Sequence, residues 1–246
     1  MNPNIEAIFL DVGNTLRIVI KDPEFSQKAA EDLHTAVGAE QPLDEFISML
    51  KDRYKVYRKR AKTILLDVRE TELWSKWMLP DYPEELIAPQ ASKLTRHWRD
   101  IKGRRVPREG VKETIIELHR RGYKLGLIAN TITETEIPDW MEEDEVREYF
   151  STVILSSIVA LRKPNPEIFL LASREIGVDP AKCAYLGDNP LRDIQGTREA
   201  GYGLMILIEE PDTLRKMPED VLINPDRTIT RIDELLDIFP PRNQDA

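Results

Sequence analysis

The chain of 246 residues has few of the residues that build cross-linked or thiolate-bound proteins. It has one cysteine, Cys183, which excludes a disulfide framework and a cysteine-built zinc site and favours a reducing, cytoplasmic compartment. Its three histidines share no metal-ligand spacing. No apolar run approaches the roughly 18 residues of a membrane span. No basic patch precedes the first apolar run, so we expect neither a membrane anchor nor a secretory signal.

The charge of the chain is acidic overall and unevenly distributed. Acidic residues number 44 and basic residues 35, which gives a net charge of −9 and a pI near 5.1. This balance disfavours nucleic acid as a partner. Residues 19–108 nevertheless carry a net charge of +3, mainly in the runs Lys51–Lys62 and Arg96–Arg108. Such runs are usually solvated helix faces, and the alternative is a positive rim that attracts a small anion.

Short apolar runs alternate with amphipathic segments along most of the chain. Continuous apolar runs between turn residues predict buried parallel strands. The intervening segments predict helices, with starts at Asn165-Pro166 and Asn189-Pro190. The alternation predicts an α/β fold, a doubly wound parallel sheet with helices on both faces. The predicted strands are Ile5–Leu10, Leu125–Ala129, Val153–Leu155, Cys183–Leu186 and Leu204–Ile208.

The segment 19–104 has a different pattern, because its apolar residues recur at helical spacing throughout. Leu43, Phe46, Leu50, Tyr54 and Tyr57 form one such stripe. The segment interrupts the sheet pattern after its first strand. We therefore expect an all-helical inserted subdomain at 19–104 and a core built from 1–18 plus 105–246.

Polar residues follow several of the predicted strands. In a doubly wound sheet the carboxyl ends of the strands form the ligand site. Carboxylates at adjacent strand ends with a lysine nearby suit a divalent cation and an anion; oxygen ligands favour Mg²⁺, and the lysine neutralises a moving phosphoryl group. The residues concerned are Asp11, Asn130, Thr131, Lys163, Asp188 and Asp193.

Four motifs carry a resemblance to a known family. An apolar strand followed by Asp-x-Asp-x-Thr corresponds to Phe9–Leu16, and a strand ending in Ser or Thr before Asn corresponds to Gly126–Asn130. A Lys-Pro-x-Pro-x-x-Phe pattern is matched by Lys163–Phe169, and Gly-Asp with a later Asp is matched by Gly187–Asp193. In this order, with a helical insert after the first motif, the chain resembles the haloacid dehalogenase-like (HAD) hydrolases of the helical-cap branch.

The resemblance implies a site and a mechanism. Asp11 would be the nucleophile and form an aspartyl-phosphate. Mg²⁺ would be held by Asp11, the carbonyl of Gly13 and Asp188, with Asp193 orienting them from behind. Lys163 would bridge the nucleophile and the phosphoryl oxygens, and the helical insert would be a cap that closes over the substrate. The implied phosphate-binding residues are Thr15, Asn130, Thr131 and Lys163.

Two positions depart from the family pattern. Gly13 replaces the second aspartate of the first motif, which serves as general acid and base, and Ala129 replaces the hydroxyl residue of the second motif. A positioned acid or base contributes about 10² to 10⁴ in rate. A hydrogen bond to a charged group contributes about 1.5 to 3 kcal/mol. Thr131 and Thr133 are candidate substitutes for the lost hydroxyl.

These departures leave several functions open. The first is an Mg²⁺-dependent hydrolase of a small phosphorylated metabolite, with weakened activity or specialised for acyl or aryl phosphates, whose leaving groups need little protonation. The second is a degenerate protein that binds a phosphorylated ligand or a partner. A 2-haloacid dehalogenase also lacks the second aspartate but needs no metal. A phosphonate hydrolase would use a cap lysine, for which the candidates are Lys51, Lys55, Lys59 and Lys62.

Overall fold

The computed structural model describes residues 4–214 and 224–242, so parts of the expected core (1–3, 215–223 and 243–246) lie outside the described residues. A six-stranded parallel sheet has the order β5-β4-β1-β6-β7-β8, which confirms the predicted doubly wound α/β fold. The five predicted strands correspond to β1 (Ala7–Leu10), β4 (Lys124–Ala129), β5 (Phe150–Leu155), β6 (Cys183–Gly187) and β7 (Leu204–Ile208). The short edge strand β8 (Arg227–Ile229) was not predicted, because two of its three residues are exposed and it has no apolar run.

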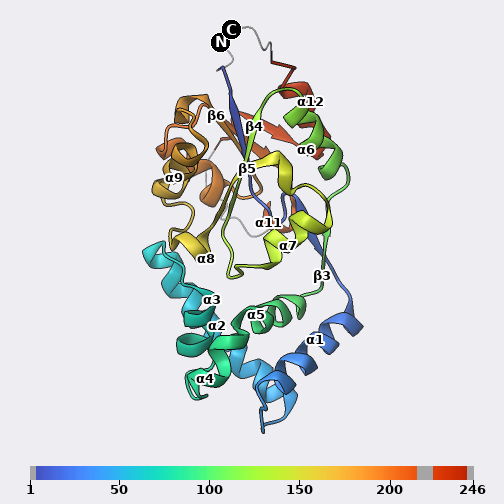
Figure 1. The fold of residues 1–246 in the computed structure, drawn as a ribbon, viewed down its shortest axis with the longest axis vertical. Coiled ribbons are helices and arrows are strands. Elements are labelled where there is room, and N and C mark those ends of the chain that lie inside the picture. Colours follow the sequence, from blue (N-terminus) through green and yellow to red (C-terminus); the bar gives the residue numbers. More distant parts are fainter. Residues whose placement is uncertain (1–3, 215–223, 243–246) are drawn as a thin grey trace.

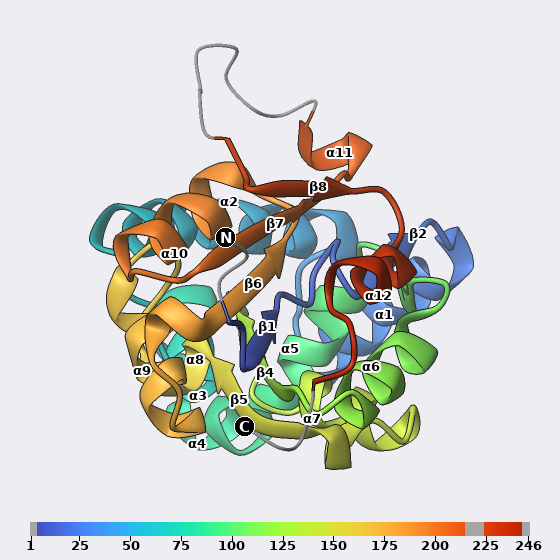
Figure 2. The ribbon, with the colours of Figure 1, turned by 90° about the horizontal axis from the view of Figure 1, so that it is seen from above.

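Helices cover both faces of the sheet (Figure 2). On one face lie α6 (Val111–Arg120), α7 (Glu136–Glu143) and α12 (Leu235–Ile238), and on the other lie α9 (Pro166–Ile176) and α10 (Gln195–Glu199). The central strand β1 is buried on both sides: Ile8 and Leu10 pack in the first core, and Ala7 and Phe9 in the second. This two-sided burial explains why the strands read as continuous apolar runs.

The two predicted asparagine caps are confirmed. The Asn165 side chain accepts a hydrogen bond from the backbone N–H of Glu167 at the start of α9. The Asn189 side chain accepts one from the N–H of Arg192, and there the chain forms a wide π-helical turn, η5 (Pro190–Ile194), before α10. π-Helical turns are uncommon in proteins, and those that occur often lie at functional sites.

The helical insert forms a separate lobe below the sheet in Figure 1. Its own apolar core includes Leu33, Phe46, Leu50, Trp74 and Leu94. Its elements are α1 (Pro23–Ala36), α2 (Leu43–Ile64), α3 (Glu70–Glu72), η1 (Leu73–Met78), α4 (Glu84–Ile87), η2 (Ala88–Gln90) and α5 (Ala91–Asp100).

An antiparallel ribbon, β2 (Arg17–Ile20) with β3 (Arg104–Pro107), connects the two lobes. The segment 19–104 was expected to be all helix, but its two ends belong to this ribbon. The β-branched run Ile18–Ile20 favours an extended chain and pairs with Arg104–Val106. The division of the chain at 18 and 105 stays a prediction, and the ribbon crosses both of these boundaries.

Ion pairs join the cap to the core. Arg96 pairs with Asp139 and Arg99 with Glu136. The buried Asp67 carboxylate accepts hydrogen bonds from Tyr57 of the cap at 2.9 Å and from Ser156, in α8 (Ser156–Val159), at 2.6 Å. These contacts hold the cap against the carboxyl ends of the strands. Within 4–214 and 224–242, no helix has both the length and the apolar composition to cross a membrane.

Candidate active site

Four charged side chains from distant parts of the sequence meet at the carboxyl ends of β1 and β6. Asp11 follows β1 and Asp188 follows β6, and these strands are paired with Leu10 opposite Leu186. Asp193 lies in η5, and Lys163 precedes α9. All four are at most 3 % exposed. The structure therefore brings together the carboxylates and the lysine that the sequence singled out.

Lys163 is the centre of this cluster. Its Nζ lies 2.8 Å from Asp11 Oδ1 and 2.8 Å from Asp193 Oδ1, and it donates to the carbonyl of Ile128 at 3.0 Å. It also donates to the Tyr185 hydroxyl at 2.6 Å. Each donor of this buried ammonium has an acceptor, so its position is well determined.

Tyr185 was missed by the sequence analysis. Burial, with Asp193 and Asp11 close by, raises the pKa of Tyr185 well above its ordinary value, so the phenol stays neutral. Its place in the buried strand β6 was an available signal, because a buried tyrosine hydroxyl usually needs a polar partner.

Arg192 was also missed by the sequence analysis, and its guanidinium lies among the three carboxylates of the site. Its Nη2 lies 3.1 Å from Asp11 Oδ2, 2.6 Å from Asp188 Oδ1 and 3.3 Å from Asp193 Oδ2. One guanidinium nitrogen thus contacts all three carboxylates. The side chain is 30 % exposed, so it reaches this position from the solvent side.

The charges of the cluster do not cancel, because three carboxylates face two cations. Burial, only partly offset by Arg192, raises the pKa of Asp188 to about 6. Asp193 responds differently: burial would raise its pKa, but Arg192 and Lys163 hold it below the ordinary value. Of these two carboxylates, Asp188 therefore has the raised pKa and Asp193 the lowered one.

The three carboxylates provide a donor set for a divalent cation. Asp11, Asp188 and Asp193 each offer one oxygen within 4.8 Å of the others. Such oxygens are what Mg²⁺ prefers. Gly187 makes this packing possible, since a Cβ there would lie 2.6 Å from the Asp193 carboxylate. The donor set fits a divalent cation, but in this structure Arg192 contacts the same side chains.

The loop after β1 is hydrogen-bonded to the segment that follows β7. The Thr213 hydroxyl, in α11 (Pro211–Leu214), donates to Asp188 Oδ2 and accepts from Asn14 Nδ2 at 3.2 Å. Gly13 is exposed, and a Cβ built on it meets no atom within 4 Å. Thr15 is fully buried, and its hydroxyl has no hydrogen-bond partner among the described residues.

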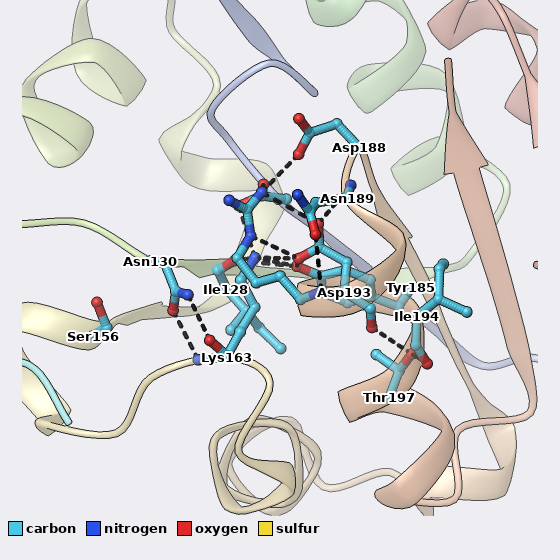
Figure 3. A network of polar contacts seen from close by, with 12 residues as sticks. Ile128, Asn130, Ser156, Lys163, Tyr185, Asp188, Asn189, Asp193, Ile194 and Thr197 are labelled. Atoms are coloured by element: carbon cyan, nitrogen blue, oxygen red, sulfur yellow. Dashed lines mark hydrogen bonds and ion pairs between the residues drawn. The ribbon is translucent and has the colours of Figure 1, made fainter. Parts of the chain in front are cut away.

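The loop after β4 positions Lys163. Asn130 Nδ2 donates to the Lys163 carbonyl at 2.9 Å, and Asn130 Oδ1 accepts from the Lys163 N–H at 2.8 Å, as Figure 3 shows. Thr133 Oγ1 accepts from the N–H of Glu136 at the start of α7. Thr131 lines a cleft between cap and core. The phosphate-binding roles expected for Thr15, Asn130 and Thr131 stay predictions.

The cleft between cap and core has a volume of about 150 Å³. The cap contributes Tyr54 and Arg58 of α2 and Arg99 of α5, and the core contributes Asn130 and Arg162. Asn130 is hydrogen-bonded to the backbone of Lys163, and Arg162 precedes Lys163 in the sequence, so one wall of the cleft is formed by residues next to that lysine.

Comparisons with known proteins agree with this geometry. A family model described as haloacid dehalogenase-like hydrolase matches residues 5–201. The phosphoserine phosphatase of Thermus thermophilus is 34 % identical over 96 % of this chain and 98 % of its own. The glyceraldehyde 3-phosphate phosphatase of Methanopyrus kandleri is 28 % identical over 95 % and 97 %. The crystal structure of a 2-haloacid dehalogenase from Pseudomonas syringae pv. Tomato DC3000 superposes with a TM-score of 0.69 at 19 % identity, covering 95 % and 97 % of the two chains, which is a similarity of fold.

Proposed function

The chain belongs to the haloacid dehalogenase-like hydrolase family, and within this family we propose that it is an Mg²⁺-dependent phosphatase of small phosphorylated metabolites. The observation that carries the proposal is the contact of 2.8 Å between the Asp11 carboxylate and the buried Lys163 ammonium, beside Asp188 and Asp193. A buried carboxylate held by a lysine at the end of a central strand is arranged as a nucleophile. The phosphatase names of the Thermus and Methanopyrus relatives support the same class.

The proposed reaction has two displacements at phosphorus. In the first, an Asp11 oxygen attacks, the bond from phosphorus to the leaving oxygen breaks, and the leaving group departs with that electron pair. In the second, water attacks the same phosphorus, the bond to Asp11 breaks, and phosphate is released. Lys163 neutralises the charge that builds up on the phosphoryl oxygens. Gly13 supplies no proton, so the leaving group takes its proton from water.

A divalent cation at the carboxylates would supply Lewis-acid stabilisation of the phosphoryl oxygens. Asp11 and Asp188 would hold it together with the Gly13 carbonyl, while Asp193 would orient the cluster. Arg192 contacts the same three side chains, so in this position it would compete with a bound cation for their oxygens. We propose that Arg192 turns outward when the cation binds, which its partial exposure permits.

The absence of a general acid at Gly13 and of a hydroxyl at Ala129 limits which phosphates the proposed enzyme can hydrolyse. Without an aspartate at Gly13, an alkoxide leaving group lacks a proton donor, whereas acyl and aryl phosphates release stable anions. We therefore propose that these activated phosphates are hydrolysed fastest.

The test is phosphate release from acetyl phosphate and p-nitrophenyl phosphate, with Mg²⁺ and with EDTA. Asp11→Asn is the matched variant, since it keeps the shape of the side chain and removes the nucleophilic charge. We expect turnover that requires both Mg²⁺ and Asp11. Equal turnover by the wild type and Asp11→Asn would contradict the proposal.

A second candidate is a binding protein of the same fold. It is favoured by the paired losses at Gly13 and Ala129 and by the Arg192 contacts with the carboxylates. This function predicts binding of orthophosphate without turnover of either substrate. The 2-haloacid dehalogenase alternative predicts halide release from 2-chloropropionate that EDTA does not affect.

A further inference from the structure

The two basic runs of the sequence meet in one groove on the cap. We define the cap groove as the depression lined by Lys51, Tyr54, Lys55, Arg58, Lys59, Lys62 and Lys102. Its volume is about 560 Å³. Six of its lining residues come from α2, and Lys102 follows α5, some forty positions further along the chain. The fold thus concentrates on one surface cations that the sequence keeps apart.

The cap groove adjoins the cleft between cap and core. Tyr54, Arg58 and Lys102 line both spaces. The other end of the cleft is lined by Asn130 and Arg162, which hold or adjoin Lys163. Cationic residues therefore line both spaces, from the neighbours of the proposed catalytic lysine to the outer surface of the cap.

Three lysines of the cap groove have no acidic partner among the described residues. No carboxylate lines the cap groove or the cleft within the described parts of the chain. In the cleft Arg99 is paired with Glu136, and Arg162 is paired with Asp67 at 2.7 Å. In the groove, by contrast, no described residue forms an ion pair with Lys55, Lys59 or Lys62. Mutual repulsion is visible at Lys62, whose pKa is lowered by Arg58, by burial and by Arg162.

Tyr54 orders the junction between the groove and the cleft. Its ring stacks on Tyr57 with centroids 6.1 Å apart and contacts Trp98 edge-on at 5.5 Å. Arg58 and Lys102 lie over the Tyr54 ring at 5.8 and 5.7 Å from its centre. The ring thus holds two cations at the point where a ligand would pass from one space to the other.

We propose that the substrate carries a second phosphate, which binds in the cap groove while the first reaches Asp11 and Lys163. This inference rests on the proposed phosphatase function and names its substrate class, a small bisphosphorylated metabolite. The positive charge of several unpaired lysines around a space of about 560 Å³ is more than one carboxylate would neutralise, and a neutral sugar would neutralise none of it. The net charge of −9 on the whole chain favours a compact polyanion over a nucleic acid.

The test compares fructose 1,6-bisphosphate with fructose 6-phosphate as substrates. The groove variant is Lys55→Gln/Lys59→Gln. Its matched control is Lys76→Gln/Lys93→Gln, which removes the same charge from exposed cap positions outside the groove. Both substrates are alkyl phosphates, so the turnover of each should be slow, but we expect the wild type to prefer the bisphosphate in kcat/KM. In the groove variant this preference should fall about tenfold, mainly through a higher KM, because this is about what two exposed ion pairs contribute together. Its turnover of p-nitrophenyl phosphate should stay unchanged.

A binding measurement separates this inference from the phosphatase function. Calorimetry of Asp11→Asn with fructose 1,6-bisphosphate, with and without the groove substitutions, needs no turnover. Weaker binding in the groove variant alone supports the inference even if no phosphate is released. Equal binding in all variants, equal loss in the control, or tighter binding of a single-stranded oligonucleotide than of the bisphosphate would overturn it. Absence of Asp11-dependent phosphate release would count against the phosphatase function only.

Discussion

Replacing Arg192 by glutamine tests whether its side chain occupies the place of the cation. The Nη2 atom of Arg192 lies 3.1, 2.6 and 3.3 Å from the three carboxylates. A hydrogen bond to a charged group contributes about 1.5 to 3 kcal/mol. If Mg²⁺ displaces Arg192, the stability that Arg192 provides without metal equals the amount by which it weakens Mg²⁺ binding. The loss of stability without metal and the gain in Mg²⁺ affinity on replacing Arg192 therefore report the same free energy.

Arg192→Gln should accordingly change two quantities in opposite directions. With EDTA its Tm should fall by about 3 to 12 °C, because each kcal/mol corresponds to about 2 to 4 °C in a chain of this size. Its Mg²⁺ affinity should rise by about 10- to 100-fold, since 1.4 kcal/mol is about a factor of ten. In saturating Mg²⁺ the two proteins should unfold at nearly the same temperature. Calorimetric titration at constant ionic strength and thermal denaturation supply both numbers.

The control is Arg174→Gln, which removes the same charge from an exposed position of α9. It should leave both the Tm and the Mg²⁺ affinity unchanged. An Arg192→Gln variant that loses the same stability with and without Mg²⁺, at an unaltered Kd, would refute the reasoning. Arg192 would then keep its contacts in the metal-bound protein.

Three further predictions concern single residues. Because a Cβ at Gly13 meets no atom within 4 Å, Gly13→Asp should fold and raise kcat for an alkyl phosphate by about 10² or more, with little change for p-nitrophenyl phosphate; parallel assays of both substrates decide this. Burial raises the pKa of Asp188 to about 6, so the folded protein holds a proton that the unfolded chain releases near pH 4. This stabilisation is present below pH 4 and is lost as the pH rises through 6. In EDTA, urea denaturation should show the unfolding free energy falling by about 3 kcal/mol relative to Asp188→Asn, and parallel pH curves would be inconsistent with the shift. Burial raises the pKa of Cys183 to about 12, so dithionitrobenzoate should label this thiol only after unfolding, and rapid labelling of the native protein would count against the buried position.

Much of the fold follows from local patterns in the sequence. The strands that contain Ile8, Leu127 and Leu186 are buried on both faces, so they appear as apolar runs without alternation. Asn165 and Asn189 mark helix starts because their side chains satisfy backbone N–H groups nearby. The convergence of the site was also predictable, since the carboxyl ends of parallel strands lie at the same edge of a sheet.

Other parts of the site depend on contacts that no local pattern determines. Thr213 reaches Asp188 across 25 positions, and Lys102 joins the lysines of α2 only because α2 and α5 pack in one lobe. The ribbon of β2 and β3 is formed by segments that lie more than eighty positions apart. Such pairs are set by how helices and strands pack, which residue spacing along the chain does not encode.

The sequence by itself determined five strands of the sheet, the mostly helical insert and the four charged residues Asp11, Lys163, Asp188 and Asp193, because periodicity and strand ends are local properties. The tertiary structure decided what surrounds these residues. It placed the Arg192 guanidinium among the carboxylates and the Tyr185 hydroxyl against Lys163. An arginine four residues after an aspartate can point toward it or into solvent. The choice depends on the turn geometry of η5 and on the charge of side chains brought from other strands.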